Sequence, residues 1–412
     1  MRMIHRERGR GVDLAALLVA VVLVLTGGPV VAQEVGEDDA SDEVARIGLD
    51  APPSLSTAKR RQAKTNGWAL TGVAAFASGY DSNIYLGPTN TKDSAVFDLD
   101  AKLEGLFYPT RRDRIKVRLE SVNTPYTAAD NVDEFKQRVD AVYYHRFKGV
   151  GTYSLAGEFK HENDSATTSA GDSLIRDFEY LSYRAKTGFR WNVAKDQVLQ
   201  LRYYMKRKDY FETPGLNSLD WWRHGPKVKY AYDFEQPVTL VASYEFQHQI
   251  YDEEDAANRD GGEPDSNPAE VHFFHTTRAG AEWRITPWVR LMGEFRFRRK
   301  DDRFDDFESY SDYRGELAVV LIPIELLQLE AATKISYRNY DERPADTTTI
   351  PDTGALEYDR YRFEFVSRYE ISDHFAIWSI YGFDKRNSNR IGTNSFRSYT
   401  QHTVSVGVTT AF

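Results

Sequence analysis

The chain has 412 residues, a formal net charge of −9 and no cysteine, and 28% of its residues are charged. Its mean hydropathy of −0.57 excludes a membrane protein built from several helices, because each such helix needs about 20 consecutive apolar residues. The lack of cysteine excludes disulfides, thiolate metal sites and a cysteine nucleophile. The negative net charge gives no reason to expect binding to nucleic acid.

Residues 1–32 have the three parts of a secretory signal peptide. A basic start precedes an apolar run from Leu14 to Leu25, and Val30-Val31-Ala32 supplies the small residues typical of a cleavage point. The apolar run is shorter than a membrane span requires, which favours cleavage over a retained anchor. The sequence therefore predicts export from the cytoplasm and a mature chain that starts near Gln33.

Residues 33–65 are predicted to form a disordered periplasmic extension. The stretch contains the acidic run GEDDASDE, and a basic cluster follows at Lys59, Arg60 and Arg61. Its hydrophobic side chains are too few to bury the apolar surface that folding needs. We interpret the basic cluster as part of a solvated tail, with contact to a partner protein or to lipid headgroups as the alternative.

From residue 66 to residue 412, the dominant pattern is an alternation of apolar and polar side chains. A period of two is the period of a β-strand, whose successive side chains point to opposite faces. In residues 114–121, the sequence RIKVRLES places Ile, Val and Leu on one face and Arg, Lys and Glu on the other. The same alternation occurs in residues 95–107, 199–206, 289–298 and 360–365.

Two kinds of connection alternate between these predicted strands. Short turns fall at residues 109–113, 148–151, 192–196, 234–237, 285–287, 322–325 and 371–374. Longer polar loops lie near residues 84–94, 122–133, 162–174, 210–219, 251–269, 300–308, 340–355 and 385–395. Strict alternation places one kind of connection at each end of every strand pair. Counting the strands in this way gives about sixteen, with 14–18 compatible with the pattern.

The sequence therefore predicts an all-β fold, a transmembrane antiparallel up-and-down β-barrel with short periplasmic turns and long extracellular loops. In hydrocarbon every backbone N–H and C=O must be paired, so strands span a membrane only when their sheet closes. A β-sandwich is disfavoured because it would bury the many Lys and Arg side chains of one face. We expect insertion into the Gram-negative outer membrane by the barrel assembly machinery, in contact with outer-membrane lipid.

The polar faces of the predicted strands carry about two basic side chains for each acidic one, which indicates a basic lumenal wall. Such a wall concentrates anions and repels cations. It favours passage of anionic or saccharide solutes, whereas opposite charges that pair across strands only to stiffen the wall are the alternative. The predicted wall consists of Lys102, Arg114, Lys116, Arg118, Arg184, Lys186, Arg202, Lys206, Lys227, Lys229, Arg290, Arg296, Arg298, Arg360 and Arg362.

The last predicted strand places Val404, Val406, Val408 and Phe412 on one face. Strands that close on a final phenylalanine resemble the C-terminal assembly signal of Gram-negative outer-membrane proteins. After a signal peptide and repeated amphipathic strands, this ending supports the barrel prediction.

The first predicted strand ends in GYDSNIYLG, which contains Tyr80, Asp81, Ser82 and Asn83. This run resembles the first-strand signature of a β-barrel porin group. It is also similar to a Tyr-Asp-Ser-Asn run in the C-terminal barrel of surface lipoprotein assembly modifiers. The resemblance implies an outer-membrane barrel and leaves its cargo open, because residues 33–65 are too short for the helical repeat domain of those modifiers. Asp, Ser and Asn also favour a turn where a strand ends.

Three functions are compatible with these patterns. The first is a porin-like channel for passive passage of small solutes, and the second is a secretion or surface-assembly barrel for lipoprotein or exopolysaccharide, working with a periplasmic partner. The third is a structural or adhesion barrel whose acidic loop at residues 251–269 binds an external surface.

No enzyme, cofactor or metal site is predicted from the sequence. No pattern singles out a nucleophile, and His161 and His248 are the histidines that a hydrolase hypothesis would test. On a strand, His272 and His275 point to opposite faces, so they do not share one metal ion.

Overall fold

The computed structural model describes residues 67–83, 93–127, 134–164, 178–211, 220–234, 237–258, 266–345, 354–389 and 398–411. The predicted signal peptide, the predicted extension at 33–65 and the terminal Phe412 lie outside the described residues. Among the described residues, no helix has the length and apolarity needed to cross a membrane.

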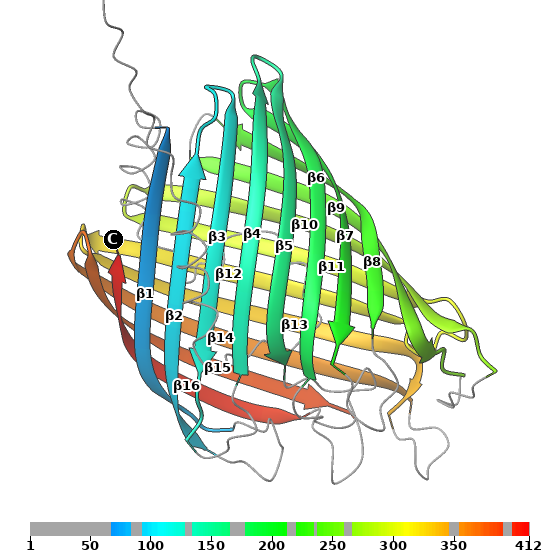
Figure 1. Cartoon of the computed structure of the whole chain (residues 1–412). Helices are drawn as coiled ribbons and strands as arrows, with labels where there is room; N and C mark the ends of the chain where they lie inside the picture. The colour runs from blue at the N-terminus through cyan, green and yellow to red at the C-terminus, as the bar shows by residue number, and fades with distance from the viewer. Residues whose placement is uncertain are drawn as a thin grey trace, which may run out of the picture.

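The described chain forms sixteen β-strands in one closed barrel (Figure 1). Each strand pairs antiparallel with the next along the chain, and the last pairs with the first. The strands are β1 (Trp68–Asp81), β2 (Ser94–Phe107), β3 (Asp113–Thr124), β4 (Glu134–Phe147), β5 (Gly151–Asp164), β6 (Phe178–Ala194), β7 (Gln197–Tyr210), β8 (Trp221–Phe234), β9 (Val238–Asp255), β10 (Ala269–Thr286), β11 (Val289–Asp302), β12 (Tyr310–Ile324), β13 (Leu327–Pro344), β14 (Ala355–Ser372), β15 (Phe375–Ser388) and β16 (Tyr399–Ala411).

The two ends of the barrel differ in the length of their connections. Short connections such as residues 195–196 and 287–288 join strands at one end, which we call the turn end. Long connections such as residues 256–268 join them at the other end, which we call the loop end. The predicted strand number, up-and-down order and alternation of turns with loops are therefore confirmed.

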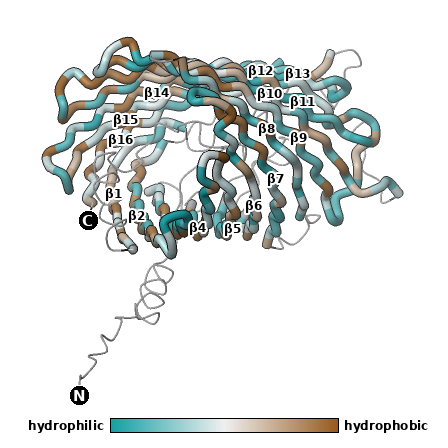
Figure 2. The backbone as a smooth tube through the Cα atoms, turned by 90° about the horizontal axis from the view of Figure 1, so that it is seen from above, coloured by the Kyte–Doolittle hydropathy of each residue, from teal (hydrophilic) through white to brown (hydrophobic). Residues whose placement is uncertain are grey.

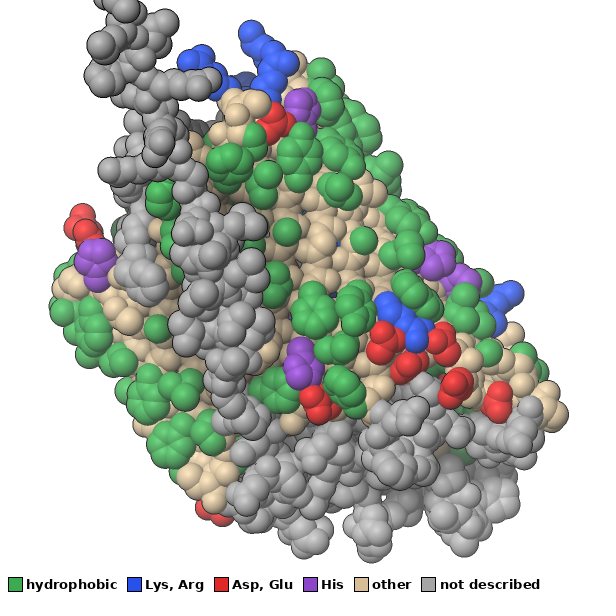
Figure 3. Space-filling model, viewed as in Figure 1, with side chains coloured by type: hydrophobic (Ala, Val, Ile, Leu, Met, Phe, Trp, Pro, Cys, Tyr) green, Lys and Arg blue, Asp and Glu red, His purple; other side chains and the backbone are tan. Residues whose placement is uncertain are grey.

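Apolar side chains cover the outside of the barrel, as the period of two predicts. Leu201 and Phe363 are 44% and 39% exposed, and Val406 on the last strand is 53% exposed. Hydrophobic side chains are spread over the outer surface in Figure 3. Most of the polar residues that alternate with them point inward, so most charged side chains of the strands form the inner wall, while some near the loop end, such as Arg299 and Asp301, face outward.

Buried hydrophobic residues form small clusters on the inner wall. Ala69 and Leu106 pack with Tyr108 near the turn end of β1 and β2. A second cluster contains Tyr310, Tyr340 and Leu356 on β12 to β14. These clusters leave most of the described inner surface to charged and polar groups.

Candidate functional site on the inner wall

All of the basic residues predicted for the lumenal wall lie on the inner face of their strands. They alternate with exposed outward neighbours, as Lys206 and Lys227, 3% and 5% exposed, alternate with Met205 and Val228, 46% and 41% exposed. The placement follows from the strand period alone. Whether these residues act as one surface depends on their neighbours around the barrel.

Three adjacent strands, β6, β7 and β8, carry a continuous group of cations. Within residues 180–188, 200–210 and 221–229, every charged side chain on the inner face is basic. We call this group the basic patch, and two of its members, Lys208 and Arg223, are missing from the sequence prediction. The basic patch consists of Arg184, Lys186, Arg202, Lys206, Lys208, Arg223, Lys227 and Lys229.

Carboxylates approach the basic patch from the two flanking strands. Glu158 Oε1 on β5 lies 3.7 Å from Arg184 Nη1, and Glu245 Oε2 on β9 lies 3.4 Å from Lys227 Nζ. Among the described residues of β5 to β9, the basic side chains of the patch outnumber these two flanking carboxylates.

Aromatic rings contact cations of the patch and of β11. The guanidinium carbon of Arg223 lies 4.6 Å from the ring centre of Trp221 and 4.9 Å from that of Phe274. Arg298 covers Phe274 at 4.5 Å, and Phe274 is fully buried between the two guanidinium groups. Cation–π contacts of this kind orient a guanidinium without neutralising its charge.

A similar arrangement continues on the other side of the barrel. Arg338 lies over Tyr310 and Arg386 over Tyr358, each 4.1 Å from the ring centre. Sequence reasoning missed these rings. The alternation of the strands contains a signal for them. Tyr310 and Tyr358 stand at positions that alternate with the apolar ones and that otherwise carry charged residues.

Outside the basic patch, cations and carboxylates pair across neighbouring strands. Lys116 Nζ lies 2.7 Å from Glu104 Oε2. Arg296 Nη2 lies 2.7 Å from Asp312 Oδ1, and the Nε atom of Arg362 lies 2.9 Å from Asp384 Oδ2. The interpretation that charges pair to stiffen the wall therefore describes these sectors.

The wall is also less one-sided than the sequence indicated. On β2, Asp98, Asp100 and Glu104 share the inner face with Lys102. Acidic residues are thus part of the wall as well as of the loops. The excess of positive charge is a property of the β6–β8 sector rather than of the whole barrel.

A strip of small, uncharged residues lines β1 and β16. The inner face of β1 presents Ala, Thr, Val and Gly from Ala69 to Gly79, and that of β16 presents Thr, Ser, Gly and Ala from Thr403 to Ala411. In the view along the barrel, β1 and β16 lie on the left of the ring, and β7 and β8 lie on the right (Figure 2). In the strand order, β14, β15 and β16 lie eight places from β6, β7 and β8, so the patch is opposite charged residues such as Arg360 and Asp384 as well as the uncharged face of β16.

The run from Tyr80 to Asn83 closes the seam between the first and last strands. Asp81 is 2% exposed, and its carboxylate accepts hydrogen bonds from Asn83 N–H at 2.9 Å and from Gln401 Nε2 at 2.8 Å. Asn83 Nδ2 donates to the carbonyl of Thr400 at 3.0 Å. Ser82 Oγ accepts from the backbone N–H of His402 at 2.8 Å. We call this set the seam clasp.

The four histidines that the sequence singled out do not come together on the inner wall. His161 and His248 face outward, where His161 Nε2 lies 2.6 Å from Glu179 Oε1 and the ring of His248 packs against that of His224. His272 is 1% exposed on the inside and His275 faces outward, as their spacing predicts. Within the described residues, no group of three or more His, Asp or Glu side chains is placed to hold a metal ion.

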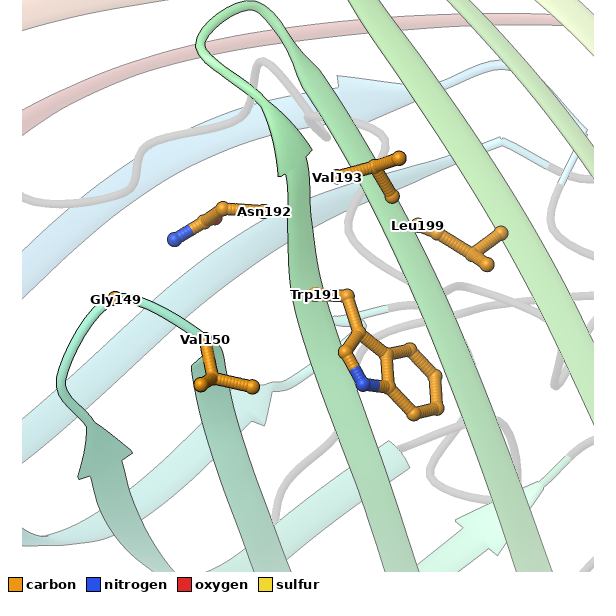
Figure 4. Close-up of a pocket in the computed structure, with 6 residues that line it drawn as sticks. All are labelled: Gly149, Val150, Trp191, Asn192, Val193 and Leu199. Atoms are coloured by element: carbon orange, nitrogen blue, oxygen red, sulfur yellow. The ribbon is translucent and has the colours of Figure 1, made fainter.

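A shallow hollow of about 500 Å³ lies at the turn end, between the β4–β5 and β6–β7 turns (Figure 4). Val150, Trp191, Val193 and Leu199 line it, together with Gly149 and Asn192. Val150 and Val193 are 52% and 59% exposed, so the hollow belongs to the apolar outer face. It offers no set of charged groups for a polar solute.

The fold and the inner wall define a 16-stranded β-barrel with an apolar exterior and a charged interior. No family model matches the chain, and no curated protein matches its sequence. Among solved structures, a loop-deletion mutant of OmpT, an outer membrane protein of Vibrio cholerae, has a TM-score of 0.47 and 9% identity over 84% of this chain and 100% of its own.

Two other solved structures give similar values. OmpF of Salmonella typhi, in complex with daunomycin, has a TM-score of 0.47 and 13% identity over 84% of this chain and 99% of its own. CdiB from Acinetobacter baumannii has a TM-score of 0.46 and 10% identity over 82% of this chain and 60% of its own. Likeness at this level says nothing of function.

Proposed function

We propose that the protein is an outer-membrane channel for passive passage of small anionic or saccharide solutes. The observation that carries this proposal is the basic patch, which places a net positive sector on the inside of a closed barrel. Cations on the wall of a low-dielectric cylinder raise the local concentration of anions and repel cations.

The two surfaces of the barrel support a membrane location. The outer face presents apolar side chains such as Leu201 and Phe363, which suit hydrocarbon. Inner side chains such as Lys334 and Arg362 are 29% and 32% exposed, so water within the barrel reaches them. The proposal includes export through residues 1–32, a periplasmic turn end and insertion by the barrel assembly machinery.

The test is the reversal potential of the purified protein in planar bilayers under a KCl gradient. We expect its sign to show preference for chloride. The variant K186Q/R202Q/K229Q removes three charges of the basic patch and should lower the anion-to-cation permeability ratio several-fold.

The matched control is R112Q/K148Q/K195Q, which removes the same charge from exposed residues at the turn end. It should keep most of the wild-type anion preference. Cation preference in the wild type, or no conductance at all, would overturn the proposal. Conductance that requires an added periplasmic partner would instead support the secretion function.

A further inference from the structure

Among the described residues, Arg386 is a cation of the inner wall that makes no ion pair. It lies on the inner face of β15, two residues before the strand ends at Ser388. Its Nε atom is buried and has no hydrogen-bond partner within the described part of the chain. A buried donor without an acceptor loses its hydration and gains nothing in return, so this position suits a ligand that supplies an acceptor.

The acidic residue closest to Arg386 along β15 is already shared by two other cations. Asp384 accepts hydrogen bonds from the Nε atoms of Arg360 and Arg362, each at 2.9 Å. Arg360 also stands directly opposite Arg386 in the register of β14 and β15. One carboxylate therefore lies among three guanidinium groups. Like charges directly opposite each other destabilise a sheet, and a bound anion would offset their repulsion.

The next strand adds a second buried donor. Tyr399, the first residue of β16, stands opposite Arg386 in the register and is 4% exposed. Its hydroxyl has no hydrogen-bond partner among the described residues. The guanidinium carbon of Arg386 lies 4.1 Å from the ring centre of Tyr358, a contact that orients the cation without neutralising it. Arg360, Arg386 and Tyr399 thus form one row across β14, β15 and β16.

Solvent reaches this part of the inner wall. The side chain of Arg362, which shares Asp384 with Arg360, is 32% exposed, and Arg386 is half-buried. These residues lie toward the loop end, where β14 begins at Ala355 and β15 ends. A solute that enters from the loop end therefore meets them near the mouth of the barrel.

From these observations we propose that Arg386 and Tyr399, with Arg360 beside them, bind the carboxylate group of a small organic acid or acidic sugar. A carboxylate matches the edge of a guanidinium with two parallel N–H···O bonds, and the Tyr399 hydroxyl supplies a further donor. The proposal rests on the channel function and deepens it, because it names the class of solute that the channel selects.

The first experiment measures binding to the purified full-length protein in detergent by isothermal titration calorimetry. The probes are D-glucuronate and D-glucose, which share the sugar ring and differ in the carboxylate. We expect saturable binding of glucuronate and none of glucose. Equal binding of the two sugars, or binding of neither, would overturn the proposal. Tighter binding of glucose 6-phosphate than of glucuronate would overturn the assignment to carboxylates.

The second experiment repeats the titration with variants. Arg386→Gln should weaken glucuronate binding about tenfold, as the loss of a charge-assisted hydrogen bond does. The matched control is Lys385→Gln, which removes the same charge from the next residue of β15, and this residue faces outward and is exposed. It should bind glucuronate as the wild type does. Equal dissociation constants for R386Q and K385Q, with both variants folded by gel mobility, would contradict the site.

Tyr399→Phe separates binding from a structural role. The variant keeps the buried ring and removes a hydroxyl that has no hydrogen-bond partner among the described residues, so the urea midpoint should not fall. Glucuronate binding should weaken several-fold. An unchanged dissociation constant for Y399F would remove the hydroxyl from the proposed site.

The carboxylate site and the channel function fail in different ways. Glucuronate binding that R386Q weakens, in a barrel without anion preference, would leave the site in place and overturn the channel function. Anion preference in bilayers, with equal glucuronate affinities for R386Q and K385Q, would do the reverse.

Discussion

At the scale of single residues, the seam clasp shows how a short local motif acquires a long-range role. Asp81 accepts its two hydrogen bonds from Asn83, two residues away, and from Gln401, which is 320 residues away. The sequence predicts the first contact, because Asp, Ser and Asn favour turns. It does not reveal the second, which exists only because β1 and β16 are neighbours in the closed barrel.

Replacing Asp81 should weaken the barrel at its seam. Asp81→Ala leaves the donors of Asn83 and Gln401 without their buried acceptor, and a lost acceptor of this kind costs about 2 kcal/mol of unfolding free energy. We expect a lower urea midpoint, measured by the gel mobility of folded and unfolded protein.

The control for the seam variant is Asp93→Ala. Asp93 is exposed and accepts a hydrogen bond from the Tyr80 hydroxyl at 3.0 Å, so its loss should change the midpoint little. Equal midpoints for D81A and the wild type would show that the clasp does not stabilise the seam.

At the scale of strands, the period of two predicted which way each side chain faces, and the alternation of turns and loops predicted the strand number. Both signals are local, because they depend on residues within one strand or one connection. The partner of each inner charge is not local. Arg360 and Asp384 meet because β14 pairs with β15 in one register, and a register shift of one residue would turn the side chains of one strand to the opposite face.

The pair Trp378 and Gly407 illustrates a contact that only the register creates. The two residues lie opposite each other on β15 and β16, and the buried Trp378 ring covers Gly407 while its Nε1 donates to Thr409 Oγ1 at 3.0 Å. A methyl group on Gly407 would overlap that ring and lie 2.6 Å from the carbonyl oxygen of Phe76.

Gly407→Ala should therefore destabilise the barrel by about 1–3 kcal/mol through overpacking. Gly315→Ala on β12 is the matched control, because nothing lies within 4 Å of the added methyl group. That change should be neutral or stabilise by about 0.5 kcal/mol through the unfolded chain. Urea midpoints of the two variants give the measurement, and equal midpoints would contradict the close packing of Trp378 on Gly407.

At the scale of the whole molecule, the net charge of −9 does not show where the charged residues lie. Their distribution, and not their sum, matters for solutes in the lumen. Cations collect on β6–β8 inside the barrel, whereas acidic residues are frequent upstream of β1 and in the connections at the loop end. Outward-facing charged groups pair with one another near the loop end, as Arg299 pairs with Asp301 and Asp341. If the proposed channel function holds, selectivity depends on the charge of one inner sector and on how far its field extends.

The extent of that field sets the salt dependence of selectivity. The Debye length falls from about 10 Å at 0.1 M to about 3 Å at 1 M ionic strength, so ions away from the wall cease to sense the basic patch at high salt. We expect the anion-to-cation permeability ratio from reversal potentials to approach unity between these two concentrations. K186Q/R202Q/K229Q should begin closer to unity and change less over the same range. A wild-type ratio that stays constant would mean that the wall charges do not set the selectivity, since a preference based on pore size is insensitive to screening.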